Sequence, residues 1–180
     1  MDDKKLKLLN LIKKVITYSD IELSSGKKSS FYIDGRILTL SPEGAYLIGE
    51  VFFDLLKDKN VDAVGGLELG AVPICGAVAA ISYLKGRPIR TFIVRKEPKK
   101  HGLRKQIEGP IKKGDKVIII DDVVTTGGSI LKAIECAEKE GLVVVGAVAL
   151  FDRLEGAKEK FKEKNINFIS IFSKDDLNVR

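Results

Sequence analysis

The sequence predicts an α/β fold, a mainly parallel central sheet with helices on both faces. The expected strands are almost continuous runs of apolar residues, and they alternate along the chain with segments whose apolar residues have helical spacing. Such strands indicate a sheet that is covered on both faces, because a strand with one face in water alternates apolar and polar residues. With 180 residues, 44% of them hydrophobic, residues 1–180 are expected to form a single domain.

Two helices are expected in the first third of the chain. Apolar residues at helical spacing between positions 6 and 16 indicate the first helix. The second is expected to begin after Ser41 and to extend to about Lys57, because a Ser followed by a Pro is typical of a helix N-terminus.

Strands and helices then alternate to the end of the chain. Strands are expected at residues 61–66, 88–94, 116–121, 143–151 and 168–172. Helices are expected at residues 72–84, 129–141 and 155–165. Since ligands of such sheets bind at the carboxyl ends of the strands, residues that follow a strand are the candidates for function.

Composition and charge limit the class of protein. Cys75 and Cys136 are well separated and fall in expected helices, so we expect no disulfide framework and a cytoplasmic location. Neither the N-terminal segment nor the apolar stretch 71–84 has the character of a signal peptide or a membrane span, so no membrane partner is expected. The formal net charge of +6 suits either a nucleic-acid surface or a pocket for an anionic small molecule.

The stretch VIIIDDVVTTGGS, residues 117–129, is the most informative motif. Asp121 and Asp122 stand at the end of an apolar strand, where burial and mutual repulsion make two carboxylates costly. The residues TTGGS then lead into a helix, whose N-terminal N–H groups can bind a phosphate. Carboxylates suit sugar hydroxyls or a hydrated divalent cation. The motif therefore indicates a ligand such as a ribose 5-phosphate; the alternative is an ordinary strand-to-helix turn.

A basic cluster lies between Arg87 and Lys105. It contains eight Lys or Arg residues, one acid, Glu97, and His101, the single histidine of the chain. Residues 97–110 have no apolar periodicity, which predicts a surface loop that becomes ordered around an anion; the alternative is a solvated basic turn. Together with the phosphate cradle and the paired carboxylates, this loop supplies the groups needed to bind and cleave a sugar diphosphate.

These motifs resemble those of a known family. Residues 117–129 resemble the phosphoribosyl diphosphate (PRPP) signature of the type I phosphoribosyltransferases. Three stretches resemble segments of the orotate phosphoribosyltransferases within that family: IELSSGKKSSFYIDGR (21–36), FIVRKEPKKHG (92–102) and ALFDR (149–153). The resemblance implies the type I phosphoribosyltransferase fold, with a small N-terminal hood of about residues 1–40 over the base site. It also implies transfer of the ribose 5-phosphate of PRPP to orotate, in UMP biosynthesis.

The resemblance implies a role for individual residues. The catalytic residues would be Lys99, His101, Asp121 and Asp122. PRPP would be bound by these and by Arg95, Lys96, Val123, Val124, Thr125, Thr126, Gly127, Gly128 and Ser129. A pyrophosphate loop would comprise Glu68, Leu69, Gly70 and Ala71, and orotate would be bound by Lys27, Tyr32, Ile33, Thr125 and Arg153.

The resemblance also implies a cofactor and a partner. Mg²⁺ would be held mainly by PRPP and water, without direct side-chain ligands, and a homodimer would share its active sites across the interface. Ser24 and Gly70 are departures, because many relatives carry a Lys at the first position and some carry one at the second. Without the resemblance, Arg153 could be a surface residue paired with Asp152 or Glu155.

Two other functions remain open. One is a phosphoribosyltransferase for another base, although a purine has no carboxylate to attract Arg153. The other is a non-catalytic PRPP-sensing regulator that uses its basic surface on nucleic acid. Against it, the positive charge lies beside the predicted active site, so we expect no nucleic-acid partner.

Overall fold

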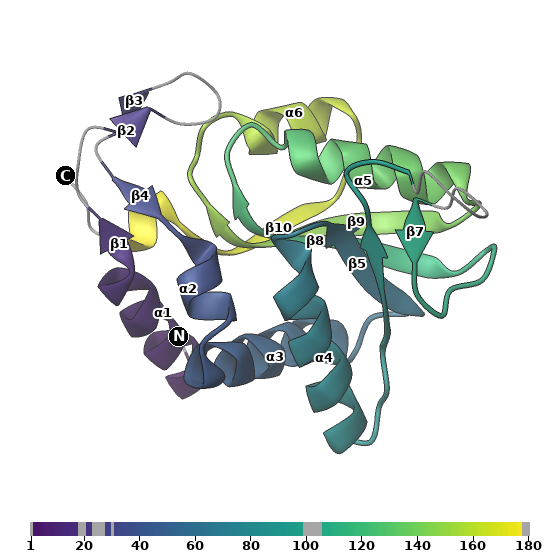
Figure 1. Cartoon of the computed structure of the whole chain (residues 1–180), viewed down its shortest axis with the longest axis horizontal. Helices are drawn as coiled ribbons and strands as arrows, with labels where there is room; N and C mark the ends of the chain where they lie inside the picture. Colours follow the sequence, from purple (N-terminus) through teal and green to yellow (C-terminus); the bar gives the residue numbers. More distant parts are fainter. Residues whose placement is uncertain (1, 18–20, 23–27, 30, 99–105, 178–180) are drawn as a thin grey trace.

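The centre of the molecule is a six-stranded sheet with the strand order β10-β9-β8-β5-β6-β7 (Figure 1). The computed structural model describes residues 2–17, 21–22, 28–29, 31–98 and 106–177. The parallel strands are β5 (Ala63–Leu67), β6 (Arg90–Val94), β8 (Lys116–Val124), β9 (Val143–Asp152) and β10 (Phe168–Ser173). All five strands expected from the sequence are therefore confirmed.

The sixth strand corrects one expectation. Residues 97–110 were expected to form a loop, but β7 (Ile107–Glu108) pairs antiparallel with β6 and places Ile107 opposite Val94. Ile107 is buried, and it is the one apolar residue of a very short strand. A strand of two residues is too short to show a periodicity, so only the tertiary structure reveals it.

Helices cover both faces of the sheet, as expected (Figure 1). The first apolar cluster joins the sheet to α1 (Asp3–Lys14), α2 (Gly35–Thr39), α3 (Pro42–Leu56) and α4 (Ala71–Leu84). The second joins it to α5 (Gly128–Lys139) and α6 (Ala157–Glu163). In β8, Ile118 and Ile120 belong to the first cluster, whereas Val117 and Ile119 belong to the second, because successive side chains of a strand point to opposite faces. None of the described helices is long and apolar enough to cross a membrane.

The described residues before position 40 lie outside the six-stranded sheet. The first helix ends at Lys14 rather than near residue 16, and Ile16 belongs instead to β1 (Ile16–Thr17), which pairs with β4 (Tyr32–Ile33). A second ribbon consists of β2 (Ile21–Glu22) and β3 (Lys28–Ser29). Helix α3 begins as expected, with the Ser41 hydroxyl accepting a hydrogen bond from the N–H of Gly44 at 3.1 Å.

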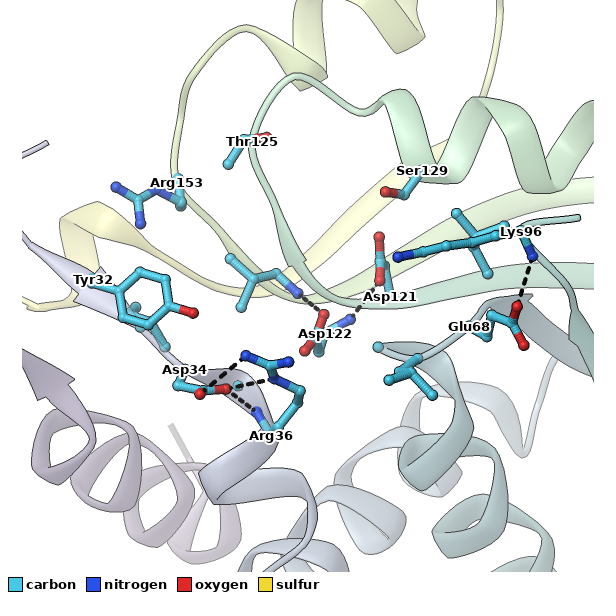
Figure 2. A pocket seen from close by; sticks show the side chains of 16 residues that line it. Tyr32, Asp34, Arg36, Glu68, Lys96, Asp121, Asp122, Thr125, Ser129 and Arg153 are labelled. Carbon is cyan, nitrogen blue, oxygen red and sulfur yellow. Dashed lines mark hydrogen bonds and ion pairs between the residues drawn. The ribbon is translucent and has the colours of Figure 1, made fainter. Parts of the chain in front are cut away.

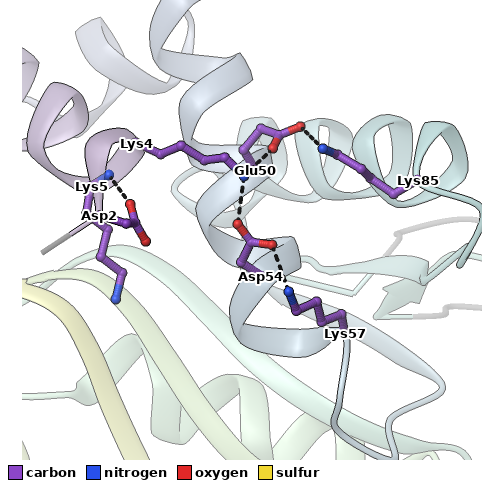
Figure 3. A network of polar contacts seen from close by, with 7 residues as sticks. All are labelled: Asp2, Lys4, Lys5, Glu50, Asp54, Lys57 and Lys85. Atoms are coloured by element: carbon purple, nitrogen blue, oxygen red, sulfur yellow. Dashed lines mark hydrogen bonds and ion pairs between the residues drawn. The ribbon is translucent and has the colours of Figure 1, made fainter.

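An ion network around the buried Glu50 fixes α1 against the rest of this layer (Figure 3). Glu50 of α3 is 2% exposed and lies 2.6 Å from the Nζ of Lys4 and 2.9 Å from the Nζ of Lys85. Lys4 also contacts Asp54, at 2.7 Å. Burial opposes the ionisation of Glu50, but the two ammonium groups outweigh it and hold its pKa below the ordinary value. The network thus ties α1 and the end of α4 to α3.

Candidate active site

A pocket of about 490 Å³ opens at the carboxyl ends of β5 and β8 (Figure 2). Its lining combines residues 32–36, residues 67–70, Lys96, residues 121–123, Thr125, Ser129 and Arg153. Most of the predicted site residues that the structure describes are among them. Segments distant in the sequence therefore meet at the sheet edge where function was expected.

The two adjacent aspartates form part of the pocket wall. They do not end their strand, since β8 continues to Val124. The carboxylate of Asp121 accepts a hydrogen bond from the N–H of Asp122 at 3.1 Å, and that of Asp122 accepts one from Val123 at 2.8 Å. Asp121 is only 7% exposed. Local backbone bonds thus orient two carboxylates that are largely removed from water.

Burial makes this pair electrostatically unfavourable. It raises the pKa of Asp121 well above the ordinary value, and the neighbouring charge of Asp122 raises it further. Burial also raises the pKa of Asp122, although the N–H of Val123 opposes that shift. Hydroxyl donors or a cation would relieve such a pair, so the pair is suited to binding one of these groups.

Two glycines allow the chain to approach the carboxylates closely. A Cβ atom on Gly35 would lie 2.7 Å from Oδ2 of Asp122. A Cβ atom on Gly70 would lie 2.7 Å from Oδ1 of Asp121, and closer still to Oδ1 of Asp122. Any side chain at position 70 would therefore displace the pair.

The N-terminus of α5 faces the same pocket. Gly127 is its N-cap residue, with a φ of +79°, and no side chain caps the helix. Among the described residues, no acceptor receives a hydrogen bond from the N–H groups of residues 126–130. Because these donors and the helix dipole favour an anion, this end of α5 is suited to a phosphate group.

The loop before α4 and the start of the basic segment are joined by hydrogen bonds. The carboxylate of Glu68 accepts from the N–H of Lys96 at 2.9 Å, and the peptide bond between Glu68 and Leu69 is cis. Lys132 of α5 donates from its Nζ to the carbonyl oxygen of Lys96 at 2.8 Å. Glu68, Leu69 and Gly70 line the pocket, whereas Ala71 is buried beneath it.

Arg153 is a buried residue and not a surface residue. Its side chain is 3% exposed, and its Nε donates to Oε1 of Glu155 at 2.8 Å. Its Nη2 donates to the carbonyl oxygen of Phe31 at 3.1 Å, and its guanidinium carbon lies 4.5 Å from the centre of the Phe31 ring. The ion pair with Glu155 considered from the sequence is present, but it is buried beside Tyr32 and Ile33 at the pocket.

Several predicted site residues do not line the pocket. Val124 ends β8, Thr126 lies in the turn, Gly127 is the N-cap residue of α5 and Gly128 is its first residue, and none of the four lines the pocket. Arg95 precedes the lining residue Lys96 and has a buried Nε with no hydrogen-bond partner among the described residues. Lys27, Lys99 and His101 lie outside the described residues, as does Ser24.

Four lining residues were not among the predicted site residues: Asp34, Gly35, Arg36 and Leu67. The first three nevertheless stand at the end of the stretch 21–36, which resembles a segment of the orotate phosphoribosyltransferases. Asp34 caps α2 and forms an ion pair with Arg36, whose Nε lies 2.9 Å from Oδ1 (Figure 2). An Asp before a Gly is a usable signal for a helix cap, but it does not indicate a pocket.

The comparisons with known proteins agree with this geometry. Residues 37–176 match the family model of the phosphoribosyl transferase domain. The orotate phosphoribosyltransferase of Aquifex aeolicus is 46% identical over 175 residues, which cover 95% of this chain and 96% of the relative. That of Methanocaldococcus jannaschii is 45% identical over 177 residues and 97% of both chains. The Mycobacterium tuberculosis orotate phosphoribosyltransferase, solved in complex with PRPP, superposes with a TM-score of 0.81, at 33% identity over 98% of this chain and 99% of the other. The chain therefore belongs to the phosphoribosyltransferase family, and within it to the orotate phosphoribosyltransferases.

Proposed function

We propose that this protein transfers the ribose 5-phosphate group of PRPP to orotate, in the formation of UMP. The bond between C1 of the ribose and the diphosphate oxygen breaks, and a ring nitrogen of orotate bonds to C1 and loses its proton. The products are orotidine 5-phosphate and pyrophosphate. The observation that carries the proposal is the convergence of a buried carboxylate pair, an uncapped helix N-terminus and a buried arginine at one pocket.

In this proposal PRPP lies along the edge of the sheet. Its 5-phosphate binds the N–H groups at the start of α5 and the side chains of Thr125 and Ser129, which line the pocket. Its ribose hydroxyls donate to Asp121 and Asp122. Burial disfavours the charged form of both carboxylates, and hydrogen bonds from the ribose hydroxyls offset part of that unfavourable free energy. The two carboxylates therefore gain hydrogen-bond donors when the sugar binds.

The diphosphate is proposed to lie against the loop of residues 68–71. The absence of a side chain at Gly70 lets the backbone approach both the carboxylate pair and the diphosphate. Negative charge grows on the leaving group as the bond to C1 breaks, while the ribose gains oxocarbenium character. Cationic side chains, proposed to be Arg95, Lys96, Lys99 and His101, stabilise that charge, and exclusion of water limits hydrolysis of PRPP.

Magnesium is the proposed cofactor. The described residues contain no group of three or more His, Cys, Asp or Glu side chains that could hold a metal ion. They do offer the paired carboxylates of Asp121 and Asp122, and Mg²⁺ commonly keeps several waters and binds through one or two carboxylates together with substrate phosphates. This donor set fits an ion held mainly by PRPP and water, which would neutralise charge on the diphosphate.

Orotate is proposed to bind beside Arg153, Thr125, Tyr32 and Ile33, with Lys27 contributing from the N-terminal hood. A planar guanidinium suits a carboxylate because its N–H groups match two oxygens. This feature favours orotate over a purine, which has no carboxylate. The buried, restrained state of Arg153 supports the role, since a fixed cation selects more sharply than a mobile one.

A homodimer with shared active sites is also proposed. Ile37 and Leu40 of α2 are exposed, and so are Leu69 and Val72 at the start of α4. These elements are neighbours, because Gly35 and Gly70 both approach Asp122. An apolar surface beside the pocket supports association with a second copy. The free, buried state of Cys75 and Cys136 supports the proposed cytoplasmic location.

The test is to measure turnover of orotate and PRPP in the presence of Mg²⁺. The absorbance of orotate reports its consumption, and chromatography identifies the product. Asp122→Asn is the matched control, because it keeps the shape of the side chain and removes the charge. We expect orotidine 5-phosphate from the unchanged protein and severely reduced turnover from the variant. Turnover of another base in preference to orotate would favour the first alternative, and PRPP binding without turnover of any base would favour the sensor.

A further inference from the structure

Glu155 does not line the pocket, yet it contacts the side chain proposed to recognise the base. Its Oε1 accepts the Nε–H of Arg153 at 2.8 Å, and its side chain is 18% exposed. Glu155 lies in the turn between β9 and α6, two residues beyond Arg153. The turn that carries the arginine therefore also carries its anionic partner.

Arg153 is restrained from a second direction by the N-terminal hood. Phe31 accepts a hydrogen bond from Nη2 through its carbonyl oxygen at 3.1 Å, and its buried ring lies under the guanidinium at 4.5 Å. Lys174 lies 5.7 Å from the centre of the same ring. The guanidinium group of Arg153 is planar and rigid. A hydrogen bond at Nε, a second at Nη2 and the contact with the Phe31 ring involve different parts of this group, so together they define its plane.

We propose that Glu155 is a positioning residue for base recognition: it holds the guanidinium of Arg153 in the plane that receives the carboxylate of the base. This inference rests on the proposed function and adds to it the residue that sets the geometry of the selective cation. Glu155 acts through Arg153 and does not touch the substrate.

The surroundings of Glu155 support this role over a general contribution to folding. Its second oxygen, Oε2, is buried and has no hydrogen-bond partner among the described residues. Its other oxygen, Oε1, accepts the hydrogen bond from Nε of Arg153. The described hydrogen bond of the Glu155 carboxylate is therefore directed at the guanidinium group, which is the group that it can orient.

The inference predicts a selective kinetic defect. Glu155→Gln keeps an acceptor for Nε and loses the charge. A hydrogen bond to a neutral acceptor is weaker than one to a carboxylate, so kcat/KM for orotate should fall by about 2- to 10-fold. Glu155→Ala removes the acceptor, and the fall should reach roughly 10- to 100-fold. The KM for PRPP should stay within about twofold in both variants. Glu163→Gln, on the exposed face of α6, is the matched control and should behave as the unchanged protein.

Uracil separates a positioning role from a structural one. It lacks the carboxylate, so its inhibition constant against orotate should be the same in the unchanged protein and in Glu155→Gln. The inference is overturned if both variants keep the orotate kinetics of the unchanged protein, or if orotate, PRPP and uracil are affected equally while the melting temperature of Glu155→Gln is normal. If the unchanged protein does not turn over orotate, the proposed function itself is wrong and the inference falls with it.

Discussion

Replacing Asp121 by Asn should make the ligand-free protein more stable while it impairs turnover. The two side chains have the same shape, and an Asn oxygen can still accept the 3.1 Å hydrogen bond from the N–H of Asp122. The substitution therefore removes a buried charge beside another carboxylate without leaving a cavity. Stabilising single substitutions commonly yield about 0.5–2 kcal/mol, and we expect a gain of this order. For a chain of this length, about 1 kcal/mol corresponds to roughly 2–4 °C in melting temperature.

The gain in the free energy of unfolding from Asp121→Asn should increase with pH. Burial raises the pKa of Asp121 in the folded state, so the folded protein holds that proton at a higher pH than the unfolded chain does. Ionised Asp121 therefore lowers the free energy of unfolding at neutral and alkaline pH. This penalty disappears as the pH falls through the raised pKa towards the unfolded value of about 3.9. Asp121→Asn should thus be most stabilising near neutral or alkaline pH and nearly neutral in acid.

Calorimetric melting of both proteins at about pH 8 and about pH 4 measures the effect. Asp58→Asn, at an exposed position, controls for the loss of a charge. Saturating PRPP should stabilise the unchanged protein, by about 2.7 kcal/mol at a hundredfold excess over Kd, and should stabilise Asp121→Asn less. A lower melting temperature for Asp121→Asn near neutral pH, or a gain of equal size at both pH values, would refute the electrostatic reasoning.

Three other experiments test the remaining parts of the site. Gly70→Ala places a Cβ against both carboxylates, so the KM for PRPP should rise by about tenfold or more and the melting temperature should fall by a few degrees, since overpacking typically costs about 1–3 kcal/mol; a normal KM would contradict the close approach. Arg153→Ala should reduce kcat/KM for orotate by roughly 10- to 100-fold while the affinity for PRPP changes little, and equal losses for both substrates would instead indicate a general defect. Mixing inactive Lys99→Ala with inactive Asp122→Asn should restore activity in hybrid dimers, which have one intact site; no recovery despite proven subunit exchange would mean that each loop serves its own subunit.

The sequence alone determined the central architecture and the centre of the site. Apolar strands and helical periodicities are local patterns, so the five parallel strands and the helices between them could be predicted to within a few residues. Asp121, Asp122 and the residues 125–129 are contiguous in the chain. One strand, one turn and one helix therefore suffice to bring the carboxylates and the N–H groups together, whatever the rest of the molecule does.

Only the tertiary structure decided which distant residues complete the pocket. Arg153 meets Phe31 across more than a hundred residues of chain, and Gly35 meets Asp122 where α2 packs on the sheet. No local pattern encodes these contacts, because they depend on how the N-terminal segment docks on the strand ends. The same docking covers Arg153, so its ion pair with Glu155 is largely removed from the surface. The sequence supplies the chemical groups in this pocket, whereas packing decides their burial, their pKa values and the plane in which Arg153 is held.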